Sequence, residues 1–219
     1  MRKMGQLVAL VVVLMAAMVP TAGAQPVTGG MAPVVSSVST TQPVVFITID
    51  DGIVRDPAAL DLMRQSNTHP TLFLTQQYVQ GHEDYFTQLQ QAGASIEDHT
   101  IDHPDLKGKP LDFQRQEICA ASDSYAKVFG SRPVLFRPPY GSYDDTTRVA
   151  AADCGIKFVV NWTATVNDGV VQFQSGNTLK PGDIVLMHFR TTFTQDYTAF
   201  LNNAKEAGLT PATLTDFLG

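Results

Sequence analysis

Charged residues are scarce in this chain of 219 residues, of which 16% are charged and 44% are hydrophobic. A composition this apolar argues against a disordered chain and against a coiled coil. Positive charge is the scarcer sign, since 15 Lys and Arg face 21 Asp and Glu, which gives a formal net charge of -6. Proteins that bind nucleic acids need clustered cations, so this balance disfavours a nucleic-acid partner.

Cysteine is rare as well. The two cysteines, Cys119 and Cys154, are too few and too far apart in the sequence to form a zinc knuckle. Two interpretations are open, namely one disulfide between two helices or two buried thiols. Both are structural roles, so we assign no catalytic function to these side chains.

Only one long hydrophobic run is present, from Leu7 to Met18. Arg2 and Lys3 precede it, and small residues at 22–24 follow it in the spacing that a signal peptidase accepts. The run is short for a membrane-spanning helix, so we expect residues 1–24 to be a signal peptide, with an uncleaved membrane anchor as the alternative. The mature protein is then expected to be secreted, periplasmic or associated with the cell wall, without stable membrane insertion. Its oligomeric state is not indicated by the sequence.

The rest of the chain predicts one domain. Residues 25–42 are rich in Pro, Gly, Ser, Thr and Val and carry no charge, which is typical of a flexible linker. Strand-like and helix-like patterns then alternate through residues 43–219. We expect strands at 44–49, 71–74, 95–97, 134–136, 157–162 and 184–187, and helices at 58–65, 83–92, 111–129, 145–154 and 197–207. Such alternation predicts an α/β fold with a parallel sheet, open or closed into a barrel, whose functional residues gather at the carboxyl ends of the strands.

Polar residues with metal-binding chemistry fall at two of these strand ends. Asp50 and Asp51 follow the strand at 44–49, where two adjacent carboxylates are costly unless they are solvated or paired with a cation. Their ordinary interpretation is a turn, because Gly52 comes next. His99 and His103 follow the strand at 95–97, and histidines four apart can share one ion. An isolated pair of this kind is more often a pair of surface or capping residues.

Two further strands end in the same way. His188 ends the strand at 184–187, and Arg137 ends the strand at 134–136, followed by two prolines that stiffen the backbone up to Tyr140. Together, one Asp and two His form a ligand set that suits zinc or a similar divalent ion, with one position left for water. A bound metal lowers the pKa of that water to about 7. A second carboxylate can take the water proton and a separate His can protonate a leaving group, which predicts a metal-assisted hydrolase.

The order of these motifs resembles the polysaccharide deacetylase (NodB-like) family of carbohydrate esterases. The segment at 49–52 resembles its Thr-Phe-Asp-Asp-Gly motif, and residues 99–104 resemble its His-Thr-x-x-His-Pro motif closely. Residues 137–141, Arg-Pro-Pro-Tyr-Gly, match its third motif, and residues 181–188 are similar to its final Pro-Gly-Asp-Ile-x-Leu-x-His motif. The resemblance runs from Val44 to the carboxyl terminus. It implies a distorted (β/α) barrel that hydrolyses acetyl groups from a carbohydrate.

The resemblance also implies roles for individual residues. The metal, most simply zinc with cobalt or nickel as alternatives, would be held by Asp51, His99 and His103. Asp50 would be the general base, oriented by Arg137 through a charge-assisted hydrogen bond. The backbone amide of Tyr140 would stabilise the oxyanion, and His188 would be the general acid. Leu186 would line the pocket for the acetyl group, and Trp162 would be an aromatic residue that binds the substrate.

The fourth motif of the family, an Asp followed after two residues by Asp-Trp, is altered in this chain. With Trp162 aligned to the aromatic residue that often precedes the motif, Thr165 replaces the first acid and Gly169 replaces the Trp. Aligning Trp162 with the motif's own Trp instead puts Phe158 at the first acid. In both alignments the carboxylate expected to pair with His188 is missing. A lower pKa of His188 follows, and with it a weaker general acid or a substrate whose leaving group needs less protonation.

These observations favour an exported, metal-dependent hydrolase that acts on N-acetyl groups of a glycan such as peptidoglycan or chitin-like oligomers. An esterase for an O-acetylated polysaccharide such as acetylxylan is the closest alternative. A member that binds metal or glycan without turnover is a further alternative, supported by the altered fourth motif. A last alternative is a non-enzymatic secreted barrel in which the motifs are only turns. It requires that all four motif matches are coincidental.

Overall fold

The computed structural model describes residues 30–219, so the predicted signal peptide at 1–24 lies outside the described residues. Ten strands form one sheet: β1 (Val34–Val35), β2 (Val44–Asp51), β3 (Thr71–Leu74), β4 (Ser95–Asp98), β5 (Leu135–Phe136), β6 (Phe158–Val160), β7 (Ala164–Asn167), β8 (Val170–Phe173), β9 (Ile184–His188) and β10 (Thr210–Pro211). Their order is β1-β6-β5-β4-β3-β2-β9-β7-β8, with β10 paired to β2. All pairings between these strands are parallel except that of β7 with β8.

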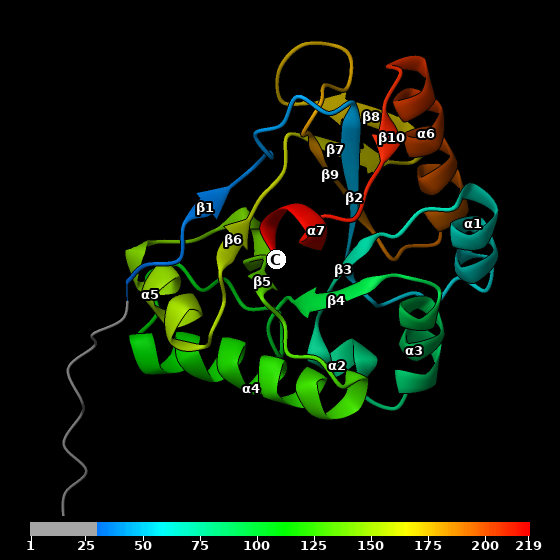
Figure 1. Ribbon diagram of the computed structural model, residues 1–219. Helices are drawn as coiled ribbons and strands as arrows, with labels where there is room; N and C mark the ends of the chain where they lie inside the picture. The colour runs from blue at the N-terminus through cyan, green and yellow to red at the C-terminus, as the bar shows by residue number, and fades with distance from the viewer. Residues whose placement is uncertain (1–29) are drawn as a thin grey trace, which may run out of the picture.

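Helices cover the outside of this curled sheet, and one further short helix lies inside it (Figure 1). The outer helices are α1 (Ala59–Ser66), α2 (Gln76–Val79), α3 (Glu83–Gln91), α4 (Leu111–Phe129), α5 (Asp145–Asp153) and α6 (Phe193–Glu206), and the inner helix is α7 (Thr215–Leu218). The predicted α/β fold is confirmed, and the sheet forms a distorted barrel that does not close, because its path runs from β1 at one edge to β8 at the other. Among residues 30–219, no helix is both long and apolar enough to cross a membrane.

Strand β2 shows how the sequence places the site. Side chains alternate between the two faces of a strand. Val45, Ile47 and Ile49 therefore pack outward against the helices, in the larger apolar cluster. Phe46 belongs to the separate cluster inside the barrel, which the C-terminal segment with α7 helps to fill (Figure 1). The same alternation points Asp50 into the barrel at the carboxyl end of the strand.

The two cysteines form a disulfide, which settles the alternative left open by the sequence. Cys119 lies on α4 and Cys154 directly follows α5, with their Cα atoms 4.9 Å apart. These two helices pack against each other and against β5 and β6 in an apolar cluster that includes Cys154. The disulfide therefore joins the two helices on the side of the barrel that carries the Arg137 strand end.

Two predictions need correction. The linker predicted over 25–42 is wrong for its described part, since β1 pairs with β6 and Ser37 bridges to Asp183. The segment lacks charge because it packs, burying Ala32 and Val38 at the sheet edge. The hairpin of β7 and β8 was not predicted, although its turn residues Asp168 and Gly169 have the positive φ values of 52° and 76° that suit a two-residue hairpin loop.

Candidate active site

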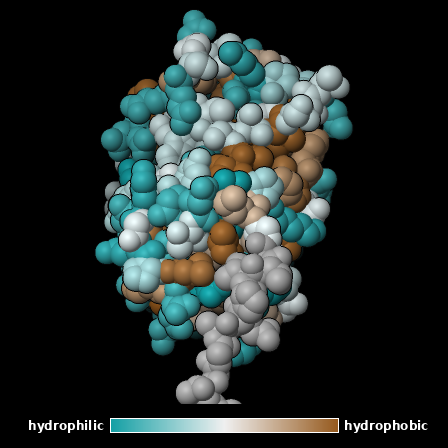
Figure 2. Space-filling view, turned by 90° about the vertical axis from the view of Figure 1, so that its left-hand side faces the viewer, coloured by the Kyte–Doolittle hydropathy of each residue, from teal (hydrophilic) through white to brown (hydrophobic). Residues whose placement is uncertain are grey.

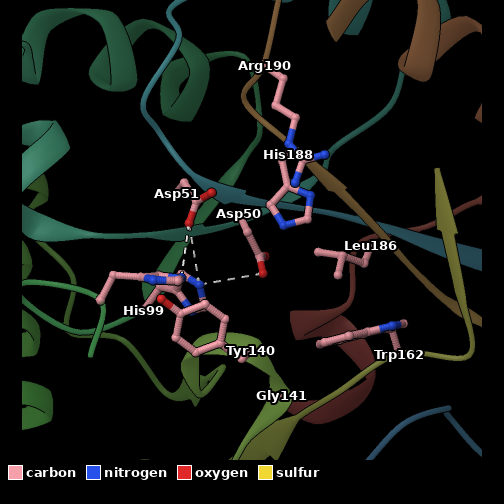
Figure 3. A pocket seen from close by; sticks show the side chains of 10 residues that line it. Asp50, Asp51, His99, Tyr140, Gly141, Trp162, Leu186, His188 and Arg190 are labelled. Atoms are coloured by element: carbon pink, nitrogen blue, oxygen red, sulfur yellow. Dashed lines mark ion pairs between the residues drawn. The ribbon is translucent and has the colours of Figure 1, made fainter. Parts of the chain in front are cut away.

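A cavity of about 380 Å³ opens at the carboxyl ends of β2 and β9. All the candidate residues named from the sequence except Arg137 line it, as Figure 3 shows for most of them. The lining consists of Asp50, Asp51, His99, His103, Tyr140, Gly141, Trp162, Leu186, His188 and Arg190. Residues separated by more than a hundred positions in the sequence thus share one pocket, as expected for a parallel sheet.

Asp51, His99 and His103 converge at one side of this cavity. Each offers a ligand atom, and these three atoms lie within 4.8 Å of one another. The Asp51 Oδ1 atom is 3.6 Å from His99 Nε2 and 3.4 Å from His103 Nε2. Tetrahedral ligands about 2.0–2.2 Å from zinc are about 3.3–3.6 Å from one another. The donor set and its spacing therefore fit a divalent ion of the zinc type.

The protonation state of His99 also fits a metal ligand. Its Nδ1 is 2.7 Å from the carbonyl oxygen of Arg137, which can only accept, so Nδ1 carries the hydrogen. The Nε2 lone pair then faces Asp51. Burial lowers the pKa of His99 to about 3, which keeps the ring neutral. Burial also raises the pKa of Asp51, against the opposing effect of His99.

The loop between the two histidines (residues 99–103, the ligand loop) is held in place by a side chain of α4. The Glu117 carboxylate accepts hydrogen bonds from the backbone N–H groups of Ile101 and Asp102, at 3.1 and 3.2 Å. Thr100 and His103 have φ values of 72° and 60°, which residues other than glycine rarely adopt. Such residues cost about 1–3 kcal/mol each and persist only where neighbouring contacts enforce them. Glu117 is thus part of the support that shapes the ligand loop.

Asp50 and Arg137 form a buried ion pair beneath the cavity. Arg137 Nη1 donates hydrogen bonds to Asp50 Oδ1 and to Thr48 Oγ1, each with a nitrogen–oxygen distance of 2.7 Å. The guanidinium also donates to the carbonyl of Val160 and lies 4.3 Å from the centroid of the Phe73 ring. Asp50 and Arg137 are only 2% and 0% exposed, so the carboxylate has a fixed position and a constant counter-charge.

His188 lies beside Asp50, as its register partner on the neighbouring strand β9, but it forms no ion pair with a carboxylate among residues 30–219. Its Nδ1 is buried without a hydrogen-bond partner among these residues. Burial lowers the pKa of His188 to about 4, the direction expected from the altered fourth motif, although burial itself is the largest cause. The aligned Thr165 lies on β7 opposite Leu186, and it cannot supply the missing charge.

Four residues, Tyr140, Gly141, Trp162 and Leu186, shape another wall of the cavity. Tyr140 is 69% exposed and has a φ of 62°. Its ring and that of His103 form a T-shaped pair with a centroid distance of 4.7 Å. Gly141 packs so closely that a Cβ atom there would be 2.9 Å from the Trp162 ring. Leu186 is buried and supplies the apolar part of the wall beside Trp162 (Figure 3).

The chain is similar to proteins of one known family. Residues 37–159, more than half of the chain, match the model of a family described as polysaccharide deacetylase. The chain belongs to the polysaccharide deacetylase family. An uncharacterized protein of Streptomyces coelicolor is 47% identical over 155 residues, which are 70% of this chain and 62% of that protein. A peptidoglycan-N-acetylglucosamine deacetylase of Bacillus cereus is 27% identical over 152 residues, 66% of this chain and 55% of that enzyme. The chain thus spans less than two thirds of either relative.

The fold agrees with this membership. The structure of a CE4 family pseudoenzyme from Bacillus anthracis has a TM-score of 0.75 to this chain at 21% identity, covering 87% of this chain and 70% of that one. The predicted distorted barrel of the polysaccharide deacetylase family is therefore confirmed as the fold.

Two residues of the candidate site are not indicated by the sequence patterns. Arg190 lines the cavity two residues after His188, and Glu117 supports the ligand loop from α4. Neither lies in a motif, so only the spatial arrangement reveals them. Tyr78 and Tyr143, two further aromatic residues near strand ends, do not line the cavity.

Proposed function

We propose that this polysaccharide deacetylase is an exported, metal-dependent hydrolase that removes N-acetyl groups from a glycan such as peptidoglycan or a chitin-like oligomer. The observation that supports it is a single cavity in which Asp51, His99 and His103 converge beside Asp50 and His188. The names of the enzyme relatives support the substrate class, since one from Bacillus cereus is a peptidoglycan-N-acetylglucosamine deacetylase.

Asp51, His99 and His103 would hold the metal, with zinc as the first expectation and cobalt or nickel as alternatives. A divalent ion there would lower the pKa of a bound water and polarise the acetyl carbonyl. Asp50 would take the proton from the attacking water, since its Oδ2 faces the ligand site at 3.7 Å from His99 Nε2. Arg137 would keep Asp50 oriented by binding its other oxygen, Oδ1.

The opposite wall would handle the acetyl group and the leaving group. His188 would give a proton to the departing sugar nitrogen. The backbone N–H of Tyr140 would donate to the acetyl oxygen as it becomes negative. This amide is free for the role because the hydrogen bonds that close the Pro139–Gly141 turn come from Gly141 and Ser142. Leu186 would contact the acetyl methyl, and Trp162 would contact the sugar.

The lack of a carboxylate partner for His188 favours two alternative functions. Without a carboxylate partner its imidazolium is poorly stabilised. An O-acetyl ester releases an alcohol, which makes a smaller demand on the acid than an amine does, so an acetylxylan-type esterase would tolerate this change. A catalytically weak member that binds metal and glycan without turnover would tolerate it too.

One assay separates these possibilities. Acetate release is measured on N-acetylated chitooligosaccharides, peptidoglycan and O-acetylated xylan, with zinc, cobalt and nickel supplied in turn. The proposal expects release from an N-acetylated glycan and a loss of at least about 100-fold in Asp50→Asn, the scale of general base catalysis. Release from xylan alone would support the esterase. Stoichiometric metal without acetate from any substrate would support the binding protein and overturn the proposal.

Export rests on separate support. The Cys119–Cys154 disulfide is typical of an oxidising compartment, and the predicted signal peptide precedes the domain. The expected result is a mature protein outside the cytoplasm whose first residue is Gln25, identified by amino-terminal sequencing. An intact amino terminus in the membrane fraction would instead support the uncleaved anchor.

A further inference from the structure

Arg190 is a cation at the rim of the active-site cavity with no assigned role. It follows β9 and lines the cavity together with His188, as Figure 3 shows. Its Nη1 donates a hydrogen bond of 3.0 Å to the side-chain oxygen of Asn167, which lies on the β7–β8 hairpin. Among residues 30–219 this is its one side-chain hydrogen bond, and it forms no ion pair. Most of its five N–H donors therefore remain available to a ligand.

The charges around the cavity leave Arg190 uncompensated. Asp50 is matched by Arg137 beneath it. Asp51 would offset one charge of the divalent ion held with the two histidines. With that ion bound, the cavity carries two net positive charges, one of them from Arg190. A neutral glycan supplies no partner for this charge, whereas an anionic glycan does.

The position of Arg190 limits where the anionic group of such a glycan can lie. The side chain lies beside His188, the proposed acid for the nitrogen that carries the acetyl group (Figure 3). Arg190 lines the same cavity as His188 and Asp51, so the guanidinium is close to the reacting end of that cavity. A group that meets Arg190 must then lie on the acetylated sugar or on the ring next to it.

We propose that Arg190 binds a carboxylate of the substrate, so that this site selects an acetylated glycan with an acidic group near the acetyl group. The inference rests on the proposed function, in which the cavity takes an acetylated glycan. A guanidinium matches the two oxygens of a carboxylate with two parallel N–H donors. The hydrogen bond that Arg190 donates to Asn167 holds the guanidinium in place, so less conformational freedom is lost when the carboxylate binds.

The test compares two glycans that differ only in charge. One is an N-acetylated tetrasaccharide with a 3-O-carboxyalkyl group on the acetylated ring, and the other is its carboxamide. A second pair carries the carboxylate or carboxamide on C6 of the neighbouring ring, which tells the two positions apart. Dissociation constants are measured by calorimetry on zinc-loaded Asp50→Asn protein, so the readout does not depend on turnover.

We expect roughly tenfold tighter binding of the carboxylate in one of the pairs, as for a charge-assisted hydrogen bond at a partly exposed site. Adding Arg190→Gln is expected to bring the ratio close to one, and Arg190→Lys to keep part of it. Arg64→Gln, which removes an exposed arginine from α1 outside the cavity, is the matched control and is expected to keep the full ratio.

Equal binding of both forms by the parent protein would overturn the inference, as would a preference that survives Arg190→Gln or the absence of binding of either form. A failed proposed function has a different signature. In that case wild-type protein releases no acetate while the carboxylate still binds through Arg190.

Discussion

Removing the disulfide between Cys119 and Cys154 should destabilise the domain without altering its active site. The bond joins α4 to the end of α5 and closes a loop with a sequence separation of 35. In the chain-entropy relation, closing a loop of that length removes about 13 cal/mol/K from the unfolded chain. At 25 °C this corresponds to about 4 kcal/mol of stability.

The expected change in melting temperature follows from the size of the domain. For a domain of 150–250 residues, each kcal/mol shifts the midpoint by about 2–4 °C, so the loss predicts a fall of about 8–16 °C. Neither cysteine lines the active-site cavity, so zinc affinity at 25 °C is expected to stay within about twofold, as for substitutions outside the critical contacts.

The assay is thermal unfolding followed by circular dichroism, with and without a phosphine reductant. Wild-type protein is compared with Cys119→Ala/Cys154→Ala, which lacks the bond but is insensitive to the reductant. The reduced wild type and the double variant should melt at similar temperatures, both below the oxidised protein. A fall of less than about 2 °C in both would refute the reasoning, because the loop would then contribute no more than about 1 kcal/mol instead of about 4.

Three further predictions concern the active site and its surroundings. Glu117→Gln should weaken zinc binding by about tenfold, because the ligand loop loses its charged acceptor. Chelator competition measures the zinc affinity. The control Asp112→Asn, at a side chain that is 96% exposed on the same helix, should leave the zinc affinity unchanged. Gly141→Ala should displace Trp162, because the added Cβ would be 2.9 Å from its ring. Since Trp162 is the single tryptophan, a red shift of its emission reports the change, and an unchanged spectrum would contradict it. Burial raises the pKa of Glu97 from 4.5 to about 8, so the native state holds a proton that the unfolded state lacks between these values. Its contribution to stability is full below about pH 4.5 and is lost as the pH rises to about 8, at about 1.4 kcal/mol per pH unit. Urea unfolding at pH 5–8 should show this slope relative to Glu97→Gln, and parallel curves for the two proteins would disprove it.

The main strands and the ligand positions could be predicted from the sequence because their signals are local. The run Val44–Ile49 is apolar on both faces, as a strand buried on both faces must be. The carboxyl ends of parallel strands meet at one edge of the sheet, so Asp51, His99 and His103 could be expected to converge. That expectation is met by ligand atoms within 4.8 Å.

The remaining features depend on contacts that no local pattern encodes. Strand β1 forms only because β6 offers it an edge, so its uncharged sequence by itself predicts a linker. The β7–β8 hairpin has a turn signal at Asp168-Gly169, but its strands have only four residues each. The outer strand, β8, buries none of its side chains fully. The position of Arg190 follows from that hairpin through Asn167, so it could not be predicted before the hairpin was known.

The measurement that tests the central claim most directly is a zinc titration of chelator-treated protein, with acetate release from an N-acetylated glycan as the signal. Release should rise linearly until one zinc is bound per chain and then stay constant, and His103→Ala should show no rise at low zinc. Release that persists in the chelator without metal would contradict the account. So would a protein that binds one zinc through these three side chains and releases no acetate.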